Sequence, residues 1–150
     1  MPYVLDGNNL IGHARGISRP SEEDRQALVV EISERLRATR ATAVLVFDGP
    51  GQRRFSFGSL TIREAGPGGA DELIVREVER SRSPREIVVV TADRDLSRRA
   101  RDAGANVVSP GEFWRRFGVR RPQASGFRET ARVDVEDWIK YFEDEKNRQE

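Results

Sequence analysis

The sequence predicts an α/β fold with a parallel sheet at its centre, and two observations support this prediction. Short apolar runs alternate with longer segments of helical periodicity along most of the chain. The clearest of these runs are rich in β-branched residues and end at a polar loop, as expected for strands buried on both faces of a sheet. The 150 residues are enough for one compact domain with a small appendage.

Five strands are predicted from the apolar runs. The run of valines before Thr91 gives the strongest signal, whereas the third run alternates polar and apolar residues and is predicted at an edge of the sheet. The first strand is expected to end in a polar loop at positions 6–9. In chain order, the predicted strands are Tyr3–Leu5, Ala43–Phe47, Leu60–Arg63, Ile87–Val90 and Asn106–Val108.

Helices are predicted between these strands from periodicity and capping signals. Ser21 with Asp24 resembles a capping box, and Ser109 followed by Pro110 is a typical N-cap and first helical position. Gly104 is the expected stop of the helix before the last strand. The predicted helices run from about residue 21 to 40, from 70 to 80, from 96 to 103 and from 110 to 117.

Three segments are predicted along the chain: a domain over 1–117, a polar linker over 118–133 and a helical appendage over 134–150. In the appendage, apolar residues recur at helical spacing in an acidic context, which predicts an amphipathic helix. These residues are Val135, Trp138, Ile139 and Phe142.

The composition excludes several classes of protein. The chain has no cysteine, so disulfides, thiolate metal sites and cysteine nucleophiles are excluded. A net charge of +1 excludes a polycationic nucleic-acid coat. No leader sequence and no membrane-length apolar run is visible, so we expect a cytoplasmic protein without membrane contact.

Aspartates follow the predicted strands at the positions where a parallel sheet places its functional crevice. Asp6 follows the first strand, Asp48 the second, and Asp93 with Asp95 the fourth, while Asp71 begins the helix after the glycine-rich segment. Each one alone is also an ordinary turn or helix-cap residue. Together they predict a cluster of carboxylates at one sheet edge, and an oxygen-only ligand set suits Mg²⁺ or Mn²⁺.

Arginines and aromatic rings alternate in the segment after Asp48. Arg53, Arg54, Phe55 and Phe57 are candidates for RNA contacts through phosphate neutralisation and base stacking, and Arg94 is a further candidate. The alternative is that a phenylalanine packs into the core and the arginines form a solvated face.

Four motifs, in this order along the chain, resemble the NYN domain family and specifically its YacP-like branch. They are Val4–Gly12, Val46–Gly49, Gly69–Glu72 and Val90–Asp93. The resemblance covers about residues 1 to 117. It implies a PIN-like three-layer fold with helices on both faces of a parallel sheet, and Mg²⁺ or Mn²⁺ bound by acidic residues at one edge for RNA phosphodiester cleavage.

The resemblance also implies roles for single residues. Asp6 would be the metal ligand of the first strand with Asn9 as the orienting amide beside it, Asp71 and Asp93 would be the other principal acids, and Asp48 would be auxiliary. Asn8 stands where the family often has an aromatic residue, a departure expected to alter packing or substrate contact more than metal binding.

The predicted function is therefore a metal-dependent endoribonuclease with Asp6, Asp71 and Asp93 as catalytic residues. The main alternative is an RNA-binding or ribosome-associated module with little or no cleavage. A metal-dependent phosphatase and a domain whose C-terminal helix acts as an interaction tether are further alternatives. RNA is the expected partner, a ribosomal context is one setting, and the apolar stripe near Trp138 would permit a homodimer.

Overall fold

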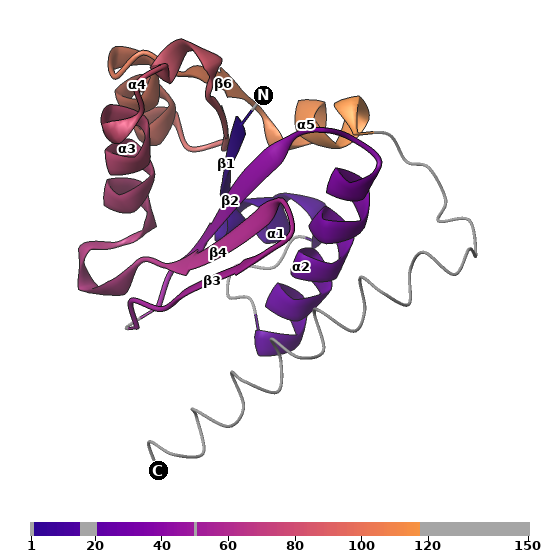
Figure 1. Cartoon of the computed structure of the whole chain (residues 1–150). Coiled ribbons are helices and arrows are strands. Elements are labelled where there is room, and N and C mark those ends of the chain that lie inside the picture. The colour runs from indigo at the N-terminus through magenta and orange to yellow at the C-terminus, as the bar shows by residue number, and fades with distance from the viewer. Residues whose placement is uncertain (1, 16–20, 50, 118–150) are drawn as a thin grey trace.

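A computed structural model of the chain describes residues 2–15, 21–49 and 51–117 (Figure 1). Their strands form one six-stranded sheet with the order β3-β4-β2-β1-β5-β6. All neighbouring strands are parallel except the β3–β4 pair at one edge. The strands are β1 (Pro2–Asp6), β2 (Thr42–Phe47), β3 (Arg54–Phe57), β4 (Leu60–Glu64), β5 (Val88–Val90) and β6 (Asn106–Val108).

Helices cover both faces of this sheet, which confirms the predicted α/β fold in three layers (Figure 1). One face packs against α1 (Gly7–Arg15), α2 (Glu22–Arg37) and α5 (Pro110–Arg116), and the other against α3 (Ala70–Arg80) and α4 (Arg94–Asp102). Short 3₁₀ helices span Gly66–Gly68 and Pro84–Glu86.

The strands divide their side chains between two apolar cores because successive residues of a strand point to opposite faces. In β1, Tyr3 and Leu5 belong to the core under α1, α2 and α5, whereas Val4 belongs to the core under α3 and α4. The central strands are thus buried on both faces, which explains why their sequences are continuously apolar.

The predicted capping signals are confirmed. The Ser21 hydroxyl oxygen accepts the backbone N–H of Asp24, whose carboxylate in turn accepts the Ser21 N–H, so the box at the start of α2 is complete. Ser109 accepts the N–H of Glu112 and begins α5 with Pro110 in its first turn.

Two local predictions were wrong. The segment expected to be a loop after Asp48 contains β3, which pairs with β4 and takes the edge position that had been expected for Leu60–Arg63. The expected loop at positions 6–9 instead contains the first turn of α1, which begins at Gly7 directly after β1.

Gly7 allows this direct passage from strand to helix. A Cβ atom at this position would lie 2.5 Å from Phe47 Cε1 and 2.9 Å from the carbonyl oxygen of Val46. Only a residue without a side chain fits against the end of β2, so the first turn of α1 packs tightly beside it.

The predicted linker over 118–133 and the helical appendage over 134–150 lie outside the described residues. Of the helices in the described part of the chain, none has the length and apolar character that crossing a bilayer requires.

Candidate acidic site at one edge of the sheet

The sheet order places three strand ends side by side at one edge. β1 lies between β2 and β5 and is parallel to both. Asp6 is the last residue of β1, Asp48 follows β2, and Asp93 follows β5 as the N-cap of α4. These three aspartates therefore lie at the same edge, which is where ligands bind in open parallel sheets.

Asp6 is buried, with 7% of its surface exposed. Its Oδ2 accepts a hydrogen bond of 3.1 Å from the Thr91 hydroxyl, and its carboxylate also accepts the backbone N–H of Asn9. Burial nevertheless dominates and raises the pKa of Asp6 to about 6, with smaller contributions from the negative charges of Asp71 and Asp48.

Thr91 joins two of the predicted acids and was missed in the sequence. Its side chain is buried, and the same hydroxyl that donates to Asp6 accepts the backbone N–H of Asp93 at 3.1 Å. A hydroxyl residue directly after a run of valines is a detectable signal, but its partner on β1 is 85 positions away in sequence.

Two successive asparagines in the first turn of α1 connect it to the neighbouring loops. The Asn9 side-chain oxygen accepts the N–H of Ala92 at 2.7 Å, in the loop after β5. The Asn8 side-chain oxygen accepts the N–H of Asp48 at 3.3 Å, in the loop after β2. Asn8 thus contacts the loop that carries one of the acids.

Asp48 is held by contacts with three helices. In addition to its N–H contact with Asn8, its carbonyl oxygen accepts a hydrogen bond of 2.9 Å from Arg25 in α2. Its carboxylate Oδ1 accepts the N–H of Ala70, the first residue of α3, at 3.0 Å. The N-cap of α3, Gly69, has no side chain for this purpose, so a carboxylate 22 positions away in sequence caps the helix instead.

Asp71 lies in the first turn of α3, one residue after the capped N–H. Its pKa is raised by partial burial first and then by the negative charges of Asp93 and Asp48, while Arg99 acts in the opposite direction. The aspartates from β2, α3 and α4 are therefore within electrostatic reach of one another.

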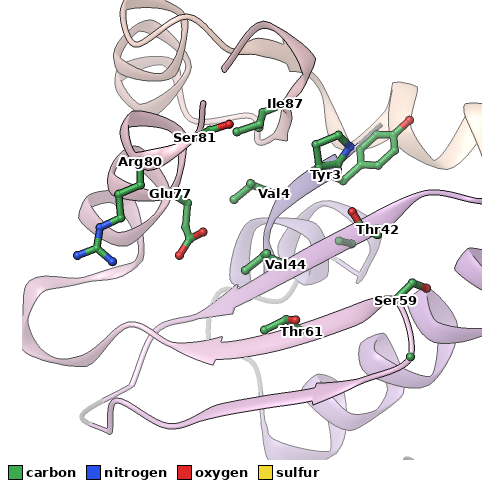
Figure 2. A pocket seen from close by; sticks show the side chains of 13 residues that line it. Tyr3, Val4, Thr42, Val44, Ser59, Thr61, Glu77, Arg80, Ser81 and Ile87 are labelled. Carbon is green, nitrogen blue, oxygen red and sulfur yellow. The ribbon is translucent and has the colours of Figure 1, made fainter. Parts of the chain in front are cut away.

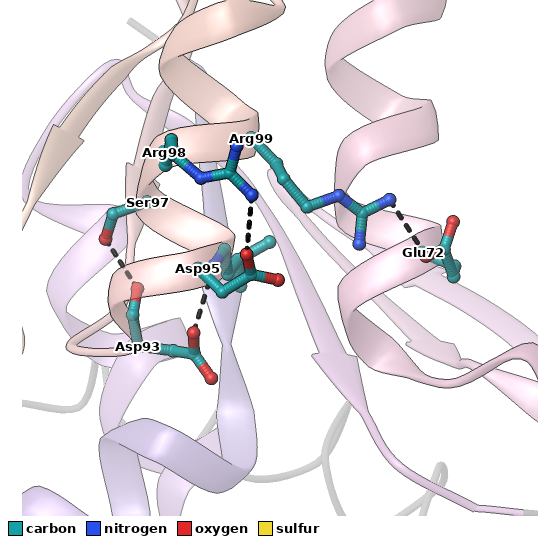
Figure 3. A network of polar contacts seen from close by, with 7 residues as sticks. Glu72, Asp93, Asp95, Ser97, Arg98 and Arg99 are labelled. Carbon is teal, nitrogen blue, oxygen red and sulfur yellow. Dashed lines mark hydrogen bonds and ion pairs between the residues drawn. The ribbon is translucent and has the colours of Figure 1, made fainter.

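Asp93 and Asp95 occupy different environments on α4 (Figure 3). Asp93 caps the helix through its Oδ1 and the N–H of Leu96 at 3.0 Å. Asp95 is exposed and pairs with Arg98 at 2.8 Å, an interaction that lowers the pKa of its carboxyl. Asp93 also affects Asp71 more strongly than Asp95 does.

The donor set fits a hard divalent cation, although the ligands are not gathered around one point. Within residues 2–15, 21–49 and 51–117, no group of three or more His, Cys, Asp or Glu side chains is arranged to hold a metal ion. However, the convergent groups are all oxygen donors, and the pKa values of two of them are raised at this edge. A cation of the Mg²⁺ or Mn²⁺ class matches that chemistry.

The candidate RNA-binding residues differ in their contacts and in their exposure. Arg53 forms a two-pronged ion pair with the buried Glu64, with a shortest distance of 2.9 Å, and Phe55 is half-buried against the core. Arg54 on β3 and Arg94 at the start of α4 are exposed. Phe57 belongs to β3, and its side chain lies outside the described part of the structure.

A family model described as the YacP-like NYN domain matches residues 3–140. The chain belongs to the YacP-like NYN domain family. This is a family of PIN-like nucleases, as the sequence motifs had indicated. The match continues past Phe117 into the part of the chain that the motifs left unassigned.

Solved structures of a YacP protein share the fold of this NYN domain. The crystal structure of Rae1 (YacP) from Bacillus subtilis is 20% identical with a TM-score of 0.63, and the match covers 99% of this chain and 85% of that one. The crystal structure of its W164L mutant is 21% identical with a TM-score of 0.63, and covers 96% and 84%. No curated protein sequence matches the chain.

Proposed function

We propose that this NYN domain is a metal-dependent endoribonuclease whose site is the acidic edge formed by Asp6, Asp71 and Asp93. The observation that supports this most is the buried Asp6, with its pKa raised to about 6 and other aspartates near it. Burial beside like charges disfavours the ionised form of this carboxylate, and a bound cation would offset that cost.

The chain's own residues would orient the acids. Thr91 and the Asn9 backbone hold the Asp6 carboxylate, and the Thr91 hydroxyl also positions the loop that carries Asp93. Asp48 holds the first turn of α3, and with it Asp71. Asp6, Asp71 and Asp93 would bind Mg²⁺ or Mn²⁺, with Asp48 as an auxiliary ligand and Asp95 as a further candidate.

A bound divalent ion supplies activation of water at neutral pH and stabilisation of charge on the phosphate. No side chain is then required as the nucleophile. The aspartates would hold the ion in a fixed position, because anionic carboxylates repel a phosphate and cannot bind it directly.

The experiment that tests this incubates wild-type protein and Asp6→Asn with a labelled structured RNA in Mn²⁺, Mg²⁺ or EDTA. Cleavage by wild type only, abolished by EDTA, is the expected result. Asp102→Asn is the matched control, because Asp102 is an exposed aspartate in the last turn of α4, and it should cut like wild type. Equal cleavage by wild type and Asp6→Asn would refute the assignment.

A second candidate function is an RNA-binding module with little or no cleavage. The observation that favours it is the absence, among the described residues, of acidic side chains already gathered around one point. Retained binding of the RNA without cutting would select this candidate. A cytoplasmic location, a ribosomal setting and a homodimer stay predictions from the sequence.

A further inference from the structure

The β3–β4 hairpin has two chemically different faces. Phe55 and Ile62 pack into the core shared with α1 and α2. Their neighbours in sequence face the α3 side of the sheet, where Arg63 forms an ion pair with Glu77 of α3. Arg54 and Phe55, neighbours in β3, therefore lie on opposite faces of the sheet: Phe55 faces the core and Arg54 faces outward.

The outward face places like residues in pairs across the two strands. Arg54 is directly opposite Arg63, and Ser56 is opposite Thr61 with 3.0 Å between their hydroxyl oxygens. Like charges directly opposite each other in a sheet are destabilising. The ion pair with Glu77 offsets this repulsion on the Arg63 side, and an anionic ligand would offset it on the Arg54 side.

Two further arginines extend this face along α3. The Arg76 guanidinium lies beside Gly68, just before the helix that carries Asp71, because a Cβ built on Gly68 would be 3.9 Å from Arg76 Nη2. Arg80, one turn later, lines a pocket of about 420 Å³ at the opposite end of the strands from the acidic edge (Figure 2). Thr61 and Glu77 line the same pocket.

We call this surface the basic strip. It contains four arginines. α3 also carries Glu72, Glu77 and Glu79, of which Glu77 pairs with Arg63 and Glu72 pairs with Arg99 of α4. β4 runs parallel to β2, so its C-terminal end reaches the acidic edge and its N-terminal end reaches the pocket. The basic strip consists of Arg54, Ser56, Thr61, Arg63, Arg76 and Arg80.

We propose that the basic strip binds the phosphate backbone of a single RNA strand that extends from the acidic edge toward the pocket lined by Arg80. This rests on the proposed nuclease function and names the path of its substrate. Guanidinium groups and hydroxyls are donors for phosphate oxygens. Contacts to phosphate carry no sequence information, so we expect recognition by the basic strip to be independent of base sequence.

The test measures binding without cleavage. Full-length protein carrying Asp6→Asn is titrated in EDTA against a fluorescein-labelled oligouridine on the order of 12 nucleotides long. Anisotropy gives Kd at several salt concentrations between about 50 and 200 mM. Arg54→Gln and Arg80→Gln are compared with Arg101→Gln and Arg115→Gln, which replace exposed arginines on α4 and α5.

Each strip variant should raise Kd about fivefold at the lowest salt and reduce the slope of log K against log salt by about 0.7. The two control variants should bind as the parent does, and an oligoadenosine of equal length should bind within about threefold of the oligouridine. No variant should unfold at a lower temperature than the parent, which separates a binding defect from misfolding.

The proposal is overturned if Arg54→Gln and Arg80→Gln bind like the controls, or if their salt slopes do not change. A strong preference for one base would also overturn it, because backbone contacts do not read bases. Failure of the nuclease function is seen separately, since wild-type protein would then cut no RNA in Mn²⁺ whatever the strip variants bind.

Discussion

At the junction of β1 and β5, Asp6 is buried, accepts hydrogen bonds from Thr91 and Asn9, and has a raised pKa. At the junction of β2 and α3, Asp48 is exposed, and its carboxylate caps a helix. The ionised form of the first carboxylate opposes folding, whereas the second stabilises the fold through the helix N-terminus. The two carboxylates of one acidic edge therefore have opposite effects on the stability of the fold.

The largest effect is expected from Asp6→Asn, which should separate activity from stability. Cleavage should fall at least a hundredfold, roughly the scale of losing one charge-stabilising group, because a metal ligand is removed. In EDTA at pH 7, the free energy of unfolding should rise by up to about 3 kcal/mol. The reason is that a neutral amide is less costly to bury than an ionised carboxylate whose pKa is raised from 3.8 to about 6. Urea denaturation of both proteins measures this. A destabilised variant would contradict the comparison.

The pH dependence of stability should differ between the same two proteins. Because the native pKa is raised, the native state binds more protons than the unfolded state between pH about 4 and 6. The contribution of Asp6 to stability therefore falls as pH rises through this window, and it is constant above the window. The difference in unfolding free energy between wild type and Asp6→Asn in EDTA should therefore grow from pH 4 to 6. A constant difference would show that Asp6 has an ordinary pKa.

Thr91→Val should be the next largest change. Valine has a similar shape but leaves the Asp6 carboxylate and the Asp93 N–H without the hydroxyl, and loss of a buried partner costs about 1–3 kcal/mol. Cleavage should fall roughly tenfold with a higher Mn²⁺ concentration at half-saturation. Thr91→Ser keeps the hydroxyl and should recover most of both. If serine and valine behave alike, the hydroxyl does not position the acids.

Asp48 should give a smaller effect that depends on the substituent. Asp48→Ala removes the cap of α3 and should cost about 1 kcal/mol, with a loss of cleavage of about fivefold through Asp71. Asp48→Asn keeps an oxygen that can accept the Ala70 N–H and should retain most of the activity. Equal, severe losses in both variants, together with weaker Mn²⁺ binding in calorimetry, would show that Asp48 is a principal ligand and not an auxiliary one.

Asp95→Asn should have the smallest effect. Its carboxylate is exposed and pairs with Arg98 on the same helix, and such surface pairs contribute little. Cleavage and melting temperature should stay close to those of wild type. A large loss of activity would show that Asp95 belongs to the site and that Asp93 is mainly a helix cap.

Local patterns were sufficient for much of this architecture. The runs that became β1, β2 and β5 were recognisable because central parallel strands are apolar on both faces, and the Ser21–Asp24 box because a capping box lies within four residues. The convergence of the aspartates followed from the same strands. β3 was missed because it has four residues, two of them polar, and is held only by its pairing with β4.

Long-range partners could not be predicted in the same way. The contacts of Thr91 with Asp6 and of Asp48 with Ala70 join residues 85 and 22 positions apart. The ion pair of Arg53 with Glu64 was likewise not predicted, because the β3–β4 hairpin brings the two residues together. Residue type indicates which groups can bond, whereas the fold decides which of them meet.

The missing side chain at Gly7 gives the two halves of the acidic edge a common mechanical constraint. Gly7 follows Asp6 and precedes Asn8, and it contacts Phe47 and Val46 just before Asp48. A methyl group there would have to displace the end of β2 or the first turn of α1. Either displacement would shift acids on both sides through steric contact, without altering any charge, so the alignment of the whole edge depends on the absence of a Cβ atom at Gly7.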